Sequence, residues 1–443
     1  MEIKPFENKY CGYLRDESRK VGFADFIAFP ECAAELSEAL RFAAERNLNV
    51  TVQGARTGFS GGAVPNGGLI ISTEKMDRIL GVTGTDCGFA LNERGGNGIR
   101  ENCGEKNVCG YVLRAQAGVT LKRIEEFLKK PKTTDGKDAD FRGGEYALAP
   151  NPTEKNATAG GLFACGAVGL NFLRKGDFAK HIASVKIADA CGNTRIINDE
   201  NEIARLCGAA GKDLETCGVP ERNAARGGAG TFCEIKPNLS ENGEDVCGAI
   251  RQNTVQNGEF SKYAAAEFEL RLTRKDIVFW GAVCFFDSEK SAFDFTDALM
   301  KRRGGNAGGA DLLAALAFFG AETLRLIRGA QTVNSALKVL PEVPDAAKAA
   351  VYFELSGMDA EKTEEALFAA ADLFEDCGGG ETWAAEGEEN LQKFRDMCHA
   401  ATEAVNGLDE RERKKCLYGY VDEDGAIISP GRDACVVRRL NGR

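Results

Sequence analysis

A strand that runs directly into a glycine-rich loop constrains the fold of this chain more than any other feature. The β-branched run Val50–Val52 is followed by glycines at positions 54, 58, 61 and 62, with Thr57 and Ser60 between them. Glycine tolerates positive φ angles and lets a ligand approach the backbone N–H groups. Several amides that face one point bind an anion, and hydroxyls can add to them. The spacing is neither that of a Rossmann loop nor that of a P-loop, so an anion cradle of another kind and a plain surface loop both stay open.

The chain length and the net charge limit the classes of protein to which this chain can belong. With 443 residues the chain is long enough for two or three domains. Its net charge of −11 argues against binding nucleic acid or an anionic membrane surface. No apolar run reaches the roughly 18 residues of a membrane span, and the N-terminus lacks the apolar core of a signal peptide. We therefore expect a cytoplasmic protein with no membrane span and no nucleic-acid partner.

The metal-binding residue types are scattered. The 16 cysteines run from Cys11 to Cys435 without a C-x-x-C pair, whereas zinc and iron–sulfur sites need tighter clusters. The only histidines are His181 and His399, which excludes a multi-histidine metal site made by this chain alone. We expect no metal, and thiols that stay reduced.

A second stretch with chemical character begins near residue 149. Pro150 and Pro152 impose an extended backbone, and Thr153 and Thr158 supply hydroxyls. Glycines 160 and 161 then open a helix of small residues that runs to about residue 169. On these residues alone, tight helix packing and a surface for a flat ligand are equally good interpretations.

Together the two stretches resemble the FAD-linked oxidases of the vanillyl-alcohol oxidase/PCMH type, and most of all the D-lactate dehydrogenase-like and glycolate oxidase-like subgroup. Residues 53–62 resemble the loop that holds the FAD diphosphate in that family. Residues 149–161 resemble its Pro-Thr-Glu-x-x-Ala-Thr-x-Gly-Gly segment, which lines the isoalloxazine and ribityl portions. The two matches occur in the family's order, about 100 residues apart.

The resemblance implies an α+β fold in which a two-subdomain PCMH-type FAD-binding domain precedes an α+β cap domain with an antiparallel sheet. The FAD-binding domain is expected over residues 1–275, with insertions at about 83–109 and 205–260. The cap or substrate domain is expected over residues 276–443, in an incomplete form.

The resemblance also implies a non-covalent FAD, since no histidine follows Arg56-Thr57-Gly58 to form a covalent link. The residues it assigns to the cofactor are Gln53, Gly54, Ala55, Arg56, Thr57, Gly58, Phe59, Ser60, Gly61, Gly62, Pro152, Thr153, Glu154, Thr158, Gly160, Gly161, Gly166 and Gly169.

The activity that the resemblance implies is oxidation of a small 2-hydroxy acid, such as D-lactate or glycolate, by hydride transfer to flavin N5. An electron-transfer flavoprotein or an iron–sulfur subunit would accept the electrons. Residues 391–399 resemble a family helix whose arginine contacts the substrate carboxylate, so Arg395 is the candidate clamp. His399, one helical turn later, is the second catalytic candidate. Without the resemblance, a solvated helix arginine and a histidine at the edge of the core would be the default interpretations.

Two segments depart from the family pattern. The Gly-Ser-Glu-Gly-Thr-Leu-Gly loop, which also touches FAD in relatives, has only a remnant at residues 257–261. The histidine-rich segments that supply a base and metal ligands near the end of relatives are absent. Three explanations stay open as expectations: a truncated chain, divergence towards another substrate, and completion by a partner. The alternative functions are a non-catalytic or electron-relay flavoprotein subunit and a degenerate copy that no longer holds FAD.

Overall fold

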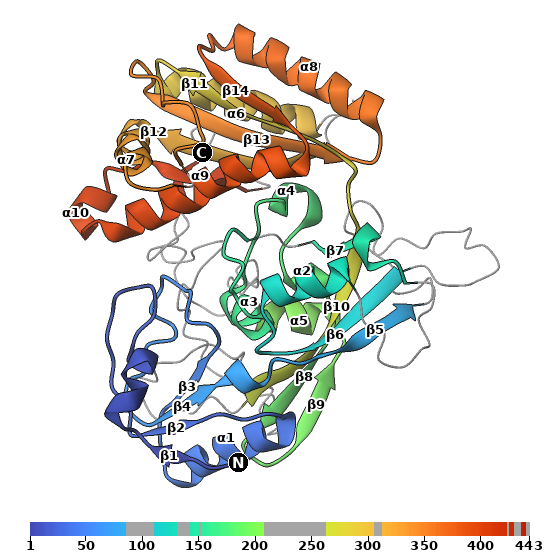
Figure 1. Cartoon of the computed structure of the whole chain (residues 1–443), viewed down its shortest axis with the longest axis vertical. Coiled ribbons are helices and arrows are strands. Elements are labelled where there is room, and N and C mark those ends of the chain that lie inside the picture. The colour runs from blue at the N-terminus through green and yellow to red at the C-terminus, as the bar shows by residue number, and fades with distance from the viewer. Residues whose placement is uncertain are drawn as a thin grey trace, which may run out of the picture. The chain divides into compact units, whose positions relative to one another are not determined.

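The computed structural model divides into two compact units (Figure 1). The first unit comprises Met1–Ala149, Glu154–Ala167 and Asp177–Arg274, and the second unit comprises Pro150–Thr153, Val168–Gly176 and Lys275–Arg443. The structure describes residues 1–85, 110–130, 141–149, 152–207, 263–304, 312–335, 337–422, 425–428 and 436–439. Apart from their first three residues, the insertions expected at 83–109 and 205–260 lie outside the described residues.

A small sheet at the start of the first unit carries the glycine-rich loop. Its strand order is β1-β2-β4-β3, and β2, β4 and β3 are parallel. The elements are β1 (Lys4–Pro5), η1 (Asn8–Leu14), β2 (Phe26–Ala28), α1 (Ala33–Glu45), β3 (Val50–Gln53), β4 (Leu69–Ser72) and η2 (Thr73–Lys75). Helix α1 connects β2 to β3 and buries its apolar stripe, which includes Leu36 and Leu40. The loop therefore begins where the parallel strand β3 ends.

The second sheet of the first unit is antiparallel, with strand order β5-β6-β10-β8-β9 and β7 paired to β10. Its strands are β5 (Ile79–Thr85), β6 (Gly110–Gln116), β7 (Tyr146–Leu148), β8 (Ile182–Asp189), β9 (Thr194–Ile197) and β10 (Tyr263–Arg274). The helices are α2 (Leu121–Lys129), η3 (Gly143–Glu145), α3 (Ala159–Cys165), η4 (Ala179–His181) and α5 (Glu200–Leu206). One hydrophobic core joins both sheets, because α1 packs on β8 and β10.

The second unit is built on an antiparallel sheet with strand order β14-β11-β13-β12-β15-β16-β17. Its strands are β11 (Val278–Phe286), β12 (Leu313–Gly320), β13 (Ala349–Gly357), β14 (Thr382–Glu386), β15 (Tyr418–Val421), β16 (Ala426–Ile428) and β17 (Val436–Arg439). The helices are α4 (Phe172–Lys175), α6 (Glu289–Gly304), α7 (Ala321–Gln331), α8 (Ala360–Asp376), α9 (Glu388–Gly407) and α10 (Glu410–Arg413).

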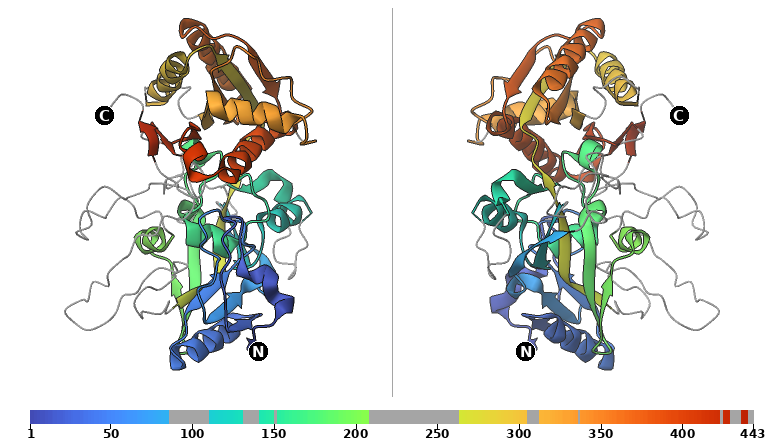
Figure 2. Two further views of the ribbon diagram at one scale, coloured as in Figure 1. Left: turned by 90° about the vertical axis from the view of Figure 1, so that its left-hand side faces the viewer. Right: turned by 90° about the vertical axis from the view of Figure 1, so that its right-hand side faces the viewer.

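Helices cover both faces of this sheet (Figure 2). Helices α6 and α8 pack on β11 and β13 over one hydrophobic core, whereas α9 packs on β11 and β14 and joins α7 over a second core. Strand β13 is buried along its whole length, as expected for a strand between two helical layers. The antiparallel sheet predicted for this part of the chain is confirmed.

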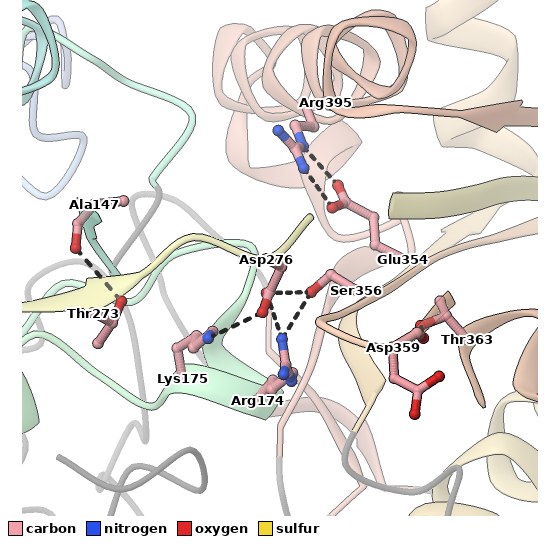
Figure 3. Close-up of polar contacts among 10 residues, drawn as sticks. All are labelled: Ala147, Arg174, Lys175, Thr273, Asp276, Glu354, Ser356, Asp359, Thr363 and Arg395. Atoms are coloured by element: carbon pink, nitrogen blue, oxygen red, sulfur yellow. Dashed lines mark hydrogen bonds and ion pairs between the residues drawn. The ribbon is translucent and has the colours of Figure 1, made fainter. Parts of the chain in front are cut away.

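A buried ion-pair cluster holds the segment Val168–Gly176 in the second unit (Figure 3). Arg174 pairs with Asp276 and donates from Nη1 to Ser356 Oγ at 3.1 Å, and Ser356 Oγ donates to Asp276 Oδ2 at 2.8 Å. Lys175 Nζ lies 3.5 Å from Asp276 Oδ1. Burial by itself raises the pKa of the Asp276 carboxyl, but the charges of Lys175 and Arg174 outweigh it, so the pKa lies below its ordinary value of 3.8.

Replacing this carboxylate is expected to destabilise the second unit. Asp276→Asn leaves Arg174 buried without its counter-charge, which costs about 3 kcal/mol of unfolding free energy at pH 7. Because the folded state lowers the Asp276 pKa, the stabilisation is complete above the unfolded value of 3.8 and is lost as the pH falls. Urea unfolding at pH 7 and pH 3 should therefore show a smaller gap between wild type and variant at pH 3. Asp294→Asn, which opens the exposed pair with Lys290, should change little and serves as the control.

Candidate functional site

The backbone of the loop after β3 offers a row of unpaired donors. None of the N–H groups of residues 54–62 donates a hydrogen bond to an acceptor among the described residues. Most of these residues are half-buried, and Arg56 and Gly61 have positive φ angles of 61° and 86°. Consecutive N–H groups in such a backbone form a concave site for an anion. Of the two alternatives that the residues left open, the anion cradle fits this geometry better.

The second predicted segment lies against this loop. A Cβ on Gly54 would lie 2.3 Å from Thr158 Oγ1, so only glycine allows the Thr158 side chain to approach the loop this closely. Thr158 is the N-cap of α3, and its Oγ1 accepts a hydrogen bond from Gly161 N at 3.1 Å. Gly160 packs on the carbonyl of Ala117, which a Cβ would approach to 3.0 Å. The structure thus brings together Gly54, Thr158, Gly160 and Gly161 within the first unit.

Gln53 shapes the loop with its side chain. Its Nε2 donates to Tyr13 O at 2.8 Å and to Ala63 O at 2.6 Å, and the side chain is fully buried. Gln53 Oε1 and Ser72 Oγ are buried and have no hydrogen-bond partner among the described residues. The two residues are register partners at the carboxyl ends of β3 and β4. Ligands of parallel sheets bind at the carboxyl ends of the strands. The two polar atoms without a hydrogen-bond partner lie at this edge of the sheet.

The N-terminal arm, residues 8–20, also borders the loop, although none of its residues was predicted for the site. Asp16 Oδ2 accepts from Ala63 N at 3.2 Å, and the Arg56 guanidinium lies 4.4 Å from the centre of the Tyr13 ring. The signal in the sequence is the Asp-x-Ser pattern at 16–18, since Asp16 Oδ1 also accepts from Ser18 N at 2.9 Å in a local turn.

The remaining predicted cofactor residues are divided between the units. Glu154 stabilises a turn in the first unit by accepting a hydrogen bond from Asn156 N, and Gly166 ends α3 with a φ of 57°. Pro152, Thr153 and Gly169 belong to the second unit, although the sequence analysis placed them in a domain of residues 1–275. The ion pair between Arg174 and Asp276 is the physical reason why the segment Val168–Gly176, which contains Gly169, belongs to the second unit.

Helix α9 carries both predicted catalytic residues. Arg395 is 7% exposed and donates from Nε and Nη2 to the two carboxylate oxygens of Glu354, at 2.8 and 2.7 Å (Figure 3). Tyr352 also donates to this carboxylate. Burial alone would lower the pKa of the Arg395 guanidinium, but the hydrogen bonds and charge of Glu354 outweigh burial and raise it. One edge of the guanidinium of the predicted clamp thus binds Glu354, and its role towards a substrate stays a prediction.

The imidazole of His399 contacts the second predicted segment inside the second unit. Its Nδ1 lies 3.2 Å from Thr153 Oγ1, and its Nε2 lies 3.6 Å from the Glu403 carboxylate. The contact with Thr153 joins two predicted site residues that are 246 positions apart. It leaves the imidazole partly exposed, with a side-chain exposure of 31%.

A family model described as an FAD binding domain matches residues 24–198. The chain carries a PCMH-type FAD-binding domain. FAD is therefore the cofactor, and the unpaired amides after β3 suit its diphosphate.

A D-lactate dehydrogenase of Archaeoglobus fulgidus is 33% identical over 173 residues, which is 39% of this chain and 30% of that protein. A mitochondrial D-2-hydroxyglutarate dehydrogenase of Danio rerio is 26% identical over 39% of this chain and 26% of that protein. The region that matches these two relatives thus spans under a third of the length of each relative.

Solved structures show a similar fold over almost the whole chain. An alkyldihydroxyacetonephosphate synthase has a TM-score of 0.53 at 12% identity, covering 91% of this chain and 62% of its own. A protein named FgChi7B has a TM-score of 0.52 at 13% identity, covering 93% of this chain and 63% of its own. The predicted α+β architecture, an FAD-binding domain with an antiparallel second domain, is confirmed.

Two features are absent from the described residues. No described helix combines the length and apolarity that a bilayer crossing needs. Within the same residues, no three acidic, histidine or cysteine side chains gather as a metal ligand set would.

Proposed function

We propose that this chain is an FAD-dependent oxidoreductase that oxidises a small 2-hydroxy acid of the D-lactate or glycolate type. The observation that carries the proposal is the cradle of unpaired amides beside Thr158, inside an FAD-binding domain whose relatives are named for D-lactate and D-2-hydroxyglutarate. Bound FAD supplies the hydride acceptor. The residues proposed to hold it without a covalent bond are those of the loop 53–62 and of the segment around Thr158.

The second unit offers a group for the substrate carboxylate. The third guanidinium nitrogen of Arg395, Nη1, makes no hydrogen bond to the described residues. It is nevertheless not one of the fully buried polar atoms that lack a hydrogen-bond partner. Glu354 fixes the guanidinium plane through the other two nitrogens, so Nη1 is held in one orientation. We propose that Nη1 binds the carboxylate of the 2-hydroxy acid, because a charge-assisted hydrogen bond from a held donor loses little entropy. His399 is proposed as the proton-accepting group, with Thr153 fixing its ring.

The electron acceptor in this proposal is a protein, either an electron-transfer flavoprotein or an iron–sulfur subunit, and the location is the cytoplasm. None of the cysteines in the described part of the chain is paired in a disulfide. Unpaired thiols, some of them exposed, fit a reducing compartment.

The test is the visible spectrum of the purified protein under anaerobic conditions. We expect a flavin spectrum that bleaches on addition of D-lactate, glycolate or D-2-hydroxyglutarate and recovers with an artificial electron acceptor. The L-enantiomers serve as controls for stereochemistry. A flavin spectrum that dithionite bleaches but none of the 2-hydroxy acids does would contradict the proposed activity.

The engagement of Arg395 by Glu354 favours a second candidate, an electron-relay subunit without a complete substrate site. In that case the bound flavin would accept electrons only from a partner protein. Bleaching by a 2-hydroxy acid in the isolated chain would reject this candidate.

A further inference from the structure

We infer that Lys20, on the N-terminal arm, supplies a positive charge to the diphosphate cradle. The resemblance assigns the cradle to the loop alone, whereas the structure places this ammonium on it. A Cβ built on Gly61 would lie 3.0 Å from Lys20 Cδ and 3.4 Å from its Nζ. The lysine stem therefore lies over the glycine whose positive φ turns the loop.

The charge of Lys20 has no partner in the described part of the chain. No ion pair or side-chain hydrogen bond of its ammonium is present there, although the neighbouring arm residue Lys9 pairs with Glu7 at 2.8 Å. An ammonium beside a row of N–H groups adds to the positive potential that these amides create. A site with this positive potential favours the binding of an anion.

Two acidic side chains, one on the arm and one that contacts it, already accept hydrogen bonds. Asp16 accepts from the backbone amides of Ser18 and Ala63, and Glu74 accepts from the Tyr13 hydroxyl at 2.6 Å. Burial, followed by the bond to Glu74, raises the pKa of Tyr13 to about 12, so this phenol stays neutral. The half-buried Cys165 thiol is also neutral, because desolvation raises its pKa to about 11. Lys20 lies over Gly61 and Arg56 belongs to the loop itself, so both add positive charge at the cradle.

The arm is held firmly enough to present this charge. Gln53 binds the carbonyl of Tyr13, Glu17 N donates to Arg56 O at 3.3 Å, and Asp16 binds the amide of Ala63. These three contacts come from both ends and the middle of the loop. The arm and the loop thus form one structure in which Lys20 occupies a defined place.

The test compares FAD binding by Lys20→Met, Lys20→Arg and Lys9→Met in the full chain, with flavin fluorescence quenching after removal and re-addition of FAD. Methionine keeps an apolar stem over Gly61 and removes only the charge. We expect Lys20→Met to weaken FAD binding about tenfold and to make it less sensitive to salt, because screening acts on the missing charge. Lys20→Arg and Lys9→Met should bind as the wild type does.

A second measurement does not depend on a variant. Acetylation of lysines in the unaltered protein, read by mass spectrometry, should proceed at Lys20 without FAD and be suppressed when FAD is bound, while Lys9 reacts equally in both forms. Equal affinity of Lys20→Met and wild type for FAD, or labelling of Lys20 that FAD does not change, would overturn the inference. Neither readout requires turnover, so failure of the proposed 2-hydroxy-acid activity leaves the test intact.

Discussion

Gly54→Val is expected to yield a protein that no longer retains FAD. Even the first carbon of the new side chain would lie 2.3 Å from Thr158 Oγ1, far inside van der Waals contact, so the loop and the second segment must separate. Separation misplaces the amides of the loop relative to Thr158, and we expect at least a hundredfold loss of FAD affinity. The measurement is the flavin-to-protein absorbance ratio after purification, followed by titration of the apo-protein with FAD.

The matched control is Gly12→Ala, since nothing lies within 4 Å of a Cβ at this position of the arm. It should retain FAD at the wild-type ratio. Circular dichroism of both variants checks that the first unit folds. Full flavin content in a folded Gly54→Val protein would show that the contact between Gly54 and Thr158 is not part of the cofactor site.

Glu354→Gln is expected to give the largest loss of stability in the second unit. The variant leaves the Arg395 guanidinium buried without its counter-charge, and breaking a buried pair in this way costs about 3 to 5 kcal/mol. The neighbouring hydroxyl of Tyr352 also loses its charged acceptor. Urea unfolding followed by the fluorescence of Trp383, which lies in the core on the same side of the sheet, reports the change.

A double variant separates the structural role of Arg395 from its proposed role towards substrate. Glu354→Leu with Arg395→Met replaces the ion pair by apolar side chains of similar size, which restores much of the stability in other buried pairs. If Arg395 Nη1 binds substrate, the stable double variant keeps its flavin and loses activity with 2-hydroxy acids. Activity at the wild-type level in this variant would reduce Arg395 to a structural residue.

Local sequence signals predicted the elements that carry the cofactor site. The β-branched residues 50–52 predicted β3, and the helical spacing of apolar residues such as Leu36 and Leu40 predicted α1. Both follow from interactions within a few residues, namely backbone sterics and amphipathic periodicity. The glycines after β3 predicted a loop that is either an anion cradle or a plain surface loop, and the structure has a row of unpaired amides there.

Local sequence signals do not predict contacts between residues that are far apart in the sequence. No periodicity near Lys20 points to Gly61, and none near Arg395 points to Glu354, 41 positions away on another element. From the sequence, Arg395 was a substrate clamp by resemblance, or by default a solvated helix arginine. The structure buries it because β13 presents a carboxylate to α9.

The sequence by itself determined the local elements, because glycine spacing and hydrophobic patterns act over short distances, and its family resemblance implied the class of fold and the cofactor. Only the tertiary structure decided which residues meet around that loop and which cation has a partner. It placed Thr158 against Gly54, drew Val168–Gly176 into the second unit through Asp276, and set Lys20 over Gly61. The physical reason is that burial and pairing of a charge depend on every element packed around it, and those elements come from all parts of the chain.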